Sequence, residues 1–105
     1  MLLNDPDVRR WNQNLARGSR ATADVHLHRL AAFCHTSKTT PAALAKLPEK
    51  RLHDLLLDFV AIEEGRGRAG SFAARTIIAV KSWLKHNGVV VSRPIRIKGS
   101  RDTPT

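Results

Sequence analysis

The sequence predicts an all-α domain, a compact bundle of four to five helices followed by a short extended or β-prone segment. Two observations carry this prediction. Apolar residues recur at spacings of three and four along most of residues 6–87, and helix-capping or helix-breaking residues separate the periodic stretches. A chain of 105 residues suits one domain. We expect the helical domain over residues 1–88 and an extended linker over residues 89–105.

The first two helices have recognisable boundaries. Asp5 precedes Pro6, which places an N-cap acid before a proline at the first helical position, and Gly18 ends this helix. Ser19 is the expected N-cap of the second helix, and residues 35–40 should form a loop. The positions expected to face the core are Val8, Trp11, Leu15, Ala23, Leu27, Leu30 and Cys34, with Phe33 at the edge.

The middle of the chain predicts a short turn and a longer helix. Thr40 and Pro41 begin the turn, and Pro48 opens a helix that Glu63 and Glu64 end. The residues expected to face inward are Ala43, Leu44, Leu47, Leu52, Leu55, Leu56, Phe59 and Val60.

The last helix follows a flexible basic loop over residues 65–70. Ser71 is the expected N-cap, and the helix should run to about Asn87, before Gly88. Its inner stripe is Ala73, Ile77, Val80 and Leu84, with Trp83 beside them. Its outer face is Ser71, Arg75, Ile78, Ser82, Lys85 and His86. This outer face is cationic and short-chained, which suits close approach to a phosphate backbone.

Beyond Gly88 the pattern changes. Residues 89–91 and 95–97 are β-prone and flank Pro94, which predicts a small hairpin or an extended strap. Residues 99–105 are expected to be disordered.

The charge is concentrated in the last two-fifths of the chain. The whole sequence carries a formal charge of +9, and residues 66–105 hold nine basic residues against one acid, Asp102. Such a field indicates a polyanionic partner. Nucleic acid is favoured over an acidic membrane surface, an acidic protein or an unengaged basic surface. Arg66 and Arg68 in the flexible loop are candidates for phosphate contact.

Compartment and membrane association follow from composition. No run of 18 apolar residues exists, and the N-terminus carries acids and a proline where a signal peptide needs an apolar stretch. Cys34 is the sole cysteine and has no partner for an internal disulfide. A cytoplasmic protein without a membrane partner is therefore expected.

Nothing in the sequence predicts a cofactor, a metal or a small-molecule substrate. Gly65, Gly67 and Gly70 match a dinucleotide-binding fingerprint, but a helix precedes them where that motif needs a strand. His26 and His28 lie about 200° apart around a helix, so they do not share a ligand. The single cysteine lies on an apolar stripe, which favours core packing.

The remaining polar and aromatic clusters have structural explanations. The acidic residues Asp54, Asp58, Glu63 and Glu64 are expected to form a solvated helix face. Trp11 and Trp83 fall on or beside core stripes, so core packing is favoured over base stacking.

The order of several short motifs resembles the N-terminal core-binding domain of tyrosine recombinases, the phage-type integrases. The matching runs are Val8-Arg9-Arg10-Trp11, Gly18-Ser19-Arg20-Ala21-Thr22, Leu30-Ala31-Ala32-Phe33 and the stretch from Ala79 to Gly88. The resemblance as a whole spans roughly residues 7–95. The sequence departs from that family at four positions. His26 stands where the family often has Tyr, Phe72 where it has Thr, Lys81 where it has Arg, and Arg93 precedes Pro94 where Asn is common.

The resemblance implies a SAM-like helical fold that forms one half of a clamp around double-stranded DNA, beside other recombinase protomers. It also implies a separate catalytic domain, beyond the linker, with an Arg–His–Arg set and a nucleophilic tyrosine. This chain contains no tyrosine, so it is not expected to be an enzyme by itself. Integration or recombination of DNA would be the process it serves.

The resemblance and the outer helix faces together give the expected DNA contacts. These are Ser19, Arg20, Thr22, Arg29, Arg66, Arg68, Ser71, Arg75, Lys81, Ser82 and Lys85. Most would position the protein on phosphates, with the capped helix N-termini adding backbone donors. Arg29 and Arg75 are the best candidates for base contact, since arginine pairs bidentately with guanine. The alternative is a helical protein–protein module whose basic face meets an acidic partner.

Overall fold

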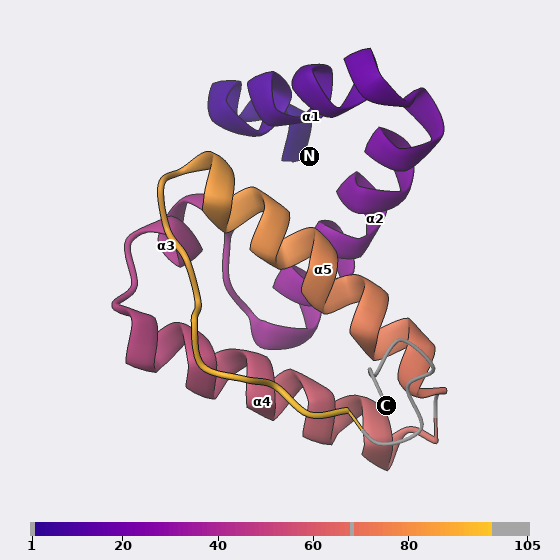
Figure 1. Ribbon diagram of the computed structural model, residues 1–105, viewed down its shortest axis with the longest axis vertical. Helices are drawn as coiled ribbons and strands as arrows, with labels where there is room; N and C mark the ends of the chain where they lie inside the picture. Colours follow the sequence, from indigo (N-terminus) through magenta and orange to yellow (C-terminus); the bar gives the residue numbers. More distant parts are fainter. Residues whose placement is uncertain (1, 68, 98–105) are drawn as a thin grey trace.

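The computed structural model describes residues 2–67 and 69–97, and these residues form helices but no strand. The elements are a 3-10 helix η1 (Leu2–Asn4) and the α-helices α1 (Pro6–Gly18), α2 (Arg20–Ser37), α3 (Pro41–Ala45), α4 (Glu49–Gly65) and α5 (Gly70–His86). The predicted all-α class is confirmed. Figure 1 shows α5 crossing the middle of the molecule, with α4 below it and α1 above it, while α2 runs from the upper right to pass behind α5.

Capping side chains explain where three of the helices begin. The Asp5 carboxylate accepts hydrogen bonds from the backbone N–H groups of Asp7 and Val8, at 2.8 and 3.4 Å. The Ser19 hydroxyl accepts one from Thr22, and Thr40 accepts one from Ala43. Each cap satisfies a backbone donor that the first helical turn leaves free. These predicted boundaries are confirmed.

The loop predicted over residues 35–40 is wrong in its first half. α2 continues through Ser37 and ends at Lys38, whose backbone takes the left-handed conformation with φ of 55°. The Lys38 N–H then closes the helix by donating to the carbonyls of Cys34 and His35. A lysine is an uncommon residue at such a position, so residue type alone did not indicate this end.

The predicted N-cap at Ser71 is also wrong. α5 begins at Gly70, and Ala69 occupies the cap position without any side-chain hydrogen bond. Ser71 lies inside the first turn, half-buried. The predicted start was late because the backbone enters the helix at small residues that carry no capping group.

The core lies between α5 and the helices packed around it. α5 contacts α1, α2, α3 and α4. Its predicted inner stripe is buried, and Trp83 donates its indole N–H to the Pro41 carbonyl at 3.0 Å, which ties α3 to α5. Trp11 lies edge-on to Trp83 with ring centroids 5.6 Å apart, and Phe33 meets Phe59 at 5.1 Å. Both tryptophans are therefore core residues, as predicted.

Two predicted orientations are wrong. Ala43, expected to face inward, is exposed on α3. Glu63, expected on a solvated acidic face, is only 1% exposed. Its carboxylate accepts a hydrogen bond from the Arg66 guanidinium at 2.8 Å, and this ion pair offsets part of the cost of burying the charge.

The segment after α5 is an extended strap rather than a hairpin. Figure 1 shows it leaving α5 and running back along α4. Alternate residues face the core, because an extended chain points successive side chains to opposite sides. Those packed against the core are Val89, Val91, Ile95 and Ile97.

Two residues of α4 hold the strap by hydrogen bonds. The Glu49 carboxylate accepts from both the backbone N–H and the hydroxyl of Ser92, each at 2.8 Å. His53 Nε2 lies 3.0 Å from the Pro94 carbonyl. The disorder predicted for residues 99–105 lies outside the described residues.

Candidate nucleic-acid interface

The outer stripe of α5 forms a one-sided cationic surface. Arg75 and Lys85 are exposed on it, Lys81 lies half-buried at its flank, and α5 contains no acidic residue. Residues spaced at three, four and seven positions share one side of a helix, which explains why Arg75 and Lys85 fall on the same side as Ile78 and Ser82.

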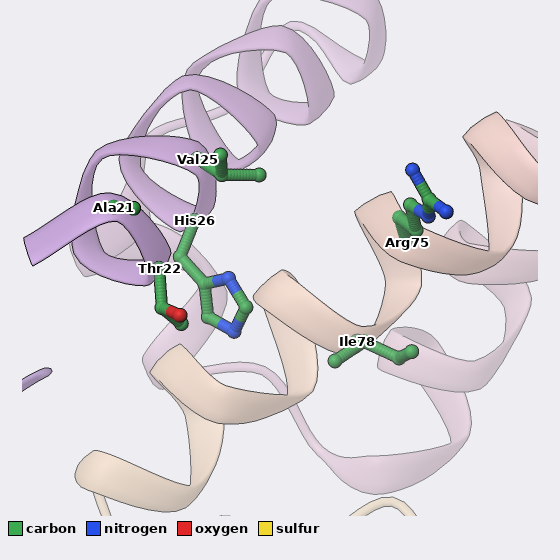
Figure 2. A pocket seen from close by; sticks show the side chains of 6 residues that line it. All are labelled: Ala21, Thr22, Val25, His26, Arg75 and Ile78. Carbon is green, nitrogen blue, oxygen red and sulfur yellow. The ribbon is translucent and has the colours of Figure 1, made fainter. Parts of the chain in front are cut away.

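A groove separates the middle of α5 from the first half of α2. Its volume is about 350 Å³, and Figure 2 shows the side chains that line it, from Ala21, Thr22, Val25 and His26 on α2 and Arg75 and Ile78 on α5. Its edges are polar at Thr22 and Arg75, whereas Val25 and Ile78 are aliphatic. These two aliphatic side chains are 46% and 50% exposed, so the groove presents apolar surface between its polar edges.

A second groove of about 360 Å³ continues this surface toward the start of α5. It is lined by Val25, His28, Arg29, Ala32 and Phe72, so Val25 borders both grooves. The Arg29 guanidinium lies 4.6 Å from the centre of the Phe72 ring. A cation over an aromatic face gains about 0.5–1 kcal/mol at exposed sites, and the stacking fixes where this charge stands.

His26 forms part of the wall between α2 and α5. Its ring centroid lies 6.4 Å from that of Trp11, and its Nδ1 is buried without a hydrogen-bond partner among the described residues. Burial lowers the pKa of His26 below its ordinary value of 6.5. The side chain is therefore mostly neutral at neutral pH, and the positive charge of the groove lining comes from Arg75.

The cations along α2 and α5 are free of carboxylate partners within the described residues. The ion pairs there join Arg10 to Asp7, Lys50 to Asp54 and Arg66 to Glu63, and none involves the groove. Arg29, Arg75, Lys81 and Lys85 are therefore available to an external anion. We define these four residues, with Thr22, Val25 and Ile78, as the α2–α5 face.

Several predicted contact residues lie apart from this face. Arg20 is nine residues before Arg29, about two and a half helical turns, so the two side chains leave α2 on opposite sides. Arg66 is held by Glu63 in the turn before α5. Ser19 is exposed but engaged in capping α2. Arg68 lies outside the described residues.

Ser82 has a structural task that its position in the sequence did not indicate. Its hydroxyl oxygen accepts a hydrogen bond from the Trp11 indole N–H at 3.1 Å. The half-buried Ser82 therefore anchors α1 to α5, and only part of it borders the outer stripe.

Sequence reasoning missed Val25 as a residue of the face. The signal was present, because Val25 follows Thr22 by three positions and precedes Arg29 by four, which puts all three on one side of α2. No local sequence pattern indicates how α2 is rotated relative to α5. It is this rotation that brings Val25 and Ile78 to one groove.

Other kinds of site find little support in the described residues. No group of three or more His, Cys, Asp or Glu side chains among residues 2–67 and 69–97 is placed to hold a metal ion. Burial raises the pKa of the Cys34 thiol to about 12. In the part of the chain that the structure describes, no helix has both the length and the apolar character needed to cross a bilayer.

Comparison with known proteins gives no relative: no family model, curated protein or solved structure matches the chain significantly.

Proposed function

We propose that this chain is a DNA-binding domain that holds double-stranded DNA against the α2–α5 face. The observation that carries the proposal is the set of four cations on two adjacent helices, Arg29, Arg75, Lys81 and Lys85, with no carboxylate partner among the described residues. A phosphate backbone supplies the missing negative charge, and contact with it releases condensed counterions.

The residues of the face divide into two tasks in this proposal. Lys81, Lys85 and Thr22 contact phosphates, which positions the protein without reading sequence. Arg29 and Arg75 reach base edges, where a guanidinium pairs bidentately with guanine. The stacking of Arg29 on Phe72 supports this assignment, since a fixed guanidinium loses less freedom on binding than a free one.

We further propose that the domain serves a tyrosine recombinase as its core-binding domain. The ordered motifs in α1, α2 and α5 support this, and the all-α fold is compatible with it. In this proposal the helical domain covers residues 1–88, and residues 89–105 lead toward a catalytic domain. Strand cleavage would need a tyrosine that this chain does not contain. The reading frame beyond Thr105 tests this part, since an Arg, then His-x-x-Arg, then Tyr would support it.

Duplex binding at several salt concentrations tests the DNA-binding proposal. Fluorescence anisotropy with a labelled duplex should give an affinity that falls with salt, with a log–log slope of about −0.9 for each phosphate contacted. Binding that is absent at low salt, or that does not change with salt, would contradict the proposal.

A second candidate function is favoured by the aliphatic pair in the groove. Val25 and Ile78, beside Arg75, suit an amphipathic acidic helix of a protein partner. Capture of a protein partner by a chain that retains no duplex DNA would support this function over the first.

A further inference from the structure

We propose that Val25 and Ile78 form a methyl-reading site within the DNA interface, one that selects duplexes carrying thymine where the groove meets the major groove. The inference rests on the proposed function and deepens it, because it assigns sequence selection to two aliphatic side chains.

Both side chains of the pair are exposed to solvent. Val25 is 46% exposed and Ile78 is 50% exposed, and both line the groove between α2 and α5 (Figure 2). Exposed apolar surface costs about 25 cal/mol per Å² relative to burial, so contact with an apolar group of a partner is favourable here.

A DNA duplex has an apolar group that suits this pair. The major-groove edge of a base pair presents one apolar group, the C5-methyl of thymine, among hydrogen-bond donors and acceptors. Phosphates and sugars are contacted by cations and donors, which the face supplies elsewhere at Lys81 and Lys85. The aliphatic pair therefore matches the base edge better than the backbone.

Polar side chains lie beside the aliphatic pair. Thr22 and Arg75 line the same groove, and the groove lining contains no carboxylate. A hydroxyl and a guanidinium beside aliphatic groups offer polar and apolar contacts to adjacent base edges. The positive charge of the lining matches the negative potential of the duplex.

The test begins with the full chain and a library of duplexes whose central segment is randomised. Sequences enriched by binding are made individually, and each thymine in turn is replaced by deoxyuridine, which removes the methyl group alone. We expect one or two positions at which this change weakens binding about fourfold, the effect of returning one buried methyl group to water.

Two variants locate the effect on the protein. The Val25→Ala, Ile78→Ala double variant should bind the thymine and deoxyuridine duplexes equally. Val90→Ala, which shortens a 67% exposed valine on the strap, should discriminate as the wild type does. Circular dichroism checks that both variants remain folded, and the exposure of the three side chains favours this.

The outcomes separate the two proposals. Loss of discrimination in the double variant alone supports the methyl-reading site. Three results would overturn the methyl-reading site while DNA binding stands. They are duplex binding without enrichment of thymine, no effect of deoxyuridine, and a double variant that discriminates thymine from deoxyuridine as well as the wild type does. Absence of duplex binding overturns both, and binding to an acidic amphipathic peptide instead assigns the groove to a protein partner.

Discussion

Trp11 on α1 donates its indole N–H to the Ser82 hydroxyl on α5, at 3.1 Å, although 71 positions separate the two residues in the chain. This bond joins the N-terminal helix to the helix that carries most of the α2–α5 face. The orientation of α1 is therefore coupled to the outer stripe of α5.

Ser82→Ala should lower the free energy of unfolding by about 1 kcal/mol, because the half-buried indole N–H loses its acceptor. Urea unfolding followed by circular dichroism measures the change. Ser71→Ala is the matched control, since Ser71 lies half-buried on the same helix and makes no side-chain hydrogen bond within the described residues. Equal stability of the two variants would contradict the structural task given to Ser82.

Arg75→Glu and Lys85→Glu should each weaken duplex binding about tenfold at low salt, and at every sequence tested. Lys85→Glu removes a phosphate contact and adds repulsion, so its log–log salt slope should also become shallower by about 0.9. Arg75→Glu removes a base contact and adds the same repulsion. Anisotropy titrations measure both quantities. Arg51→Glu changes the net charge equally from an exposed site on α4, and it should have a much smaller effect. A similar loss in all three variants would indicate general charge attraction instead.

The strap should loosen in acid because of Glu49. Hydrogen bonds from the Ser92 side chain and backbone lower the pKa of Glu49 below its ordinary value of 4.5. The stabilisation is fully present above that value, and it is lost as the pH falls below 4.5 through the lowered pKa of the folded state. Hydrogen exchange at the Ser92 amide should therefore accelerate in acid, after correction for the intrinsic rate.

Glu49→Gln should bring the same acceleration at neutral pH, since a neutral acceptor makes weaker hydrogen bonds than a carboxylate. Asp58→Asn is the control, because Asp58 is exposed on the same helix and forms no hydrogen bond or ion pair with the described part of the strap. Unchanged exchange at Ser92 in the Glu49 variant would show that apolar packing alone holds the strap.

Cys34 should resist thiol reagents while the protein is folded. Burial raises the pKa of its thiol to about 12, so the thiolate that reacts is nearly absent at neutral pH. Colorimetric titration should detect the thiol only after denaturant is added. Ala21→Cys, at an exposed position of α2, should give one fast-reacting thiol in the native state. Rapid reaction of native wild-type protein would contradict the burial of Cys34.

The parts of the fold that sequence predicted are those with local causes. Asp5, Ser19 and Thr40 cap helices through hydrogen bonds within three residues, so residue type and position were sufficient. The start of α5 escaped prediction, since Ala69 brings no capping side chain. The burial of Glu63 escaped it too, because tertiary packing decides which side of α4 is covered.

The candidate site was predicted only in part for the same reason. The cationic stripe of α5 follows from helical spacing, and Arg75 and Lys85 lie on it as predicted. The groove depends on how α2 lies against α5, so the pairing of Val25 with Ile78 had no local signal. The strap was β-prone by composition, but a strand needs a partner strand, and α4 is the neighbour instead.

The two tryptophans also make the protein its own optical reporter. The chain has no tyrosine, so its ultraviolet emission comes essentially from Trp11 and Trp83. One indole is hydrogen-bonded across the α1–α5 junction and the other across the α3–α5 junction. Replacing either tryptophan with phenylalanine leaves a single emitter at one junction. The detachment of α1 and of α3 from the central helix can then be timed separately, without any attached dye.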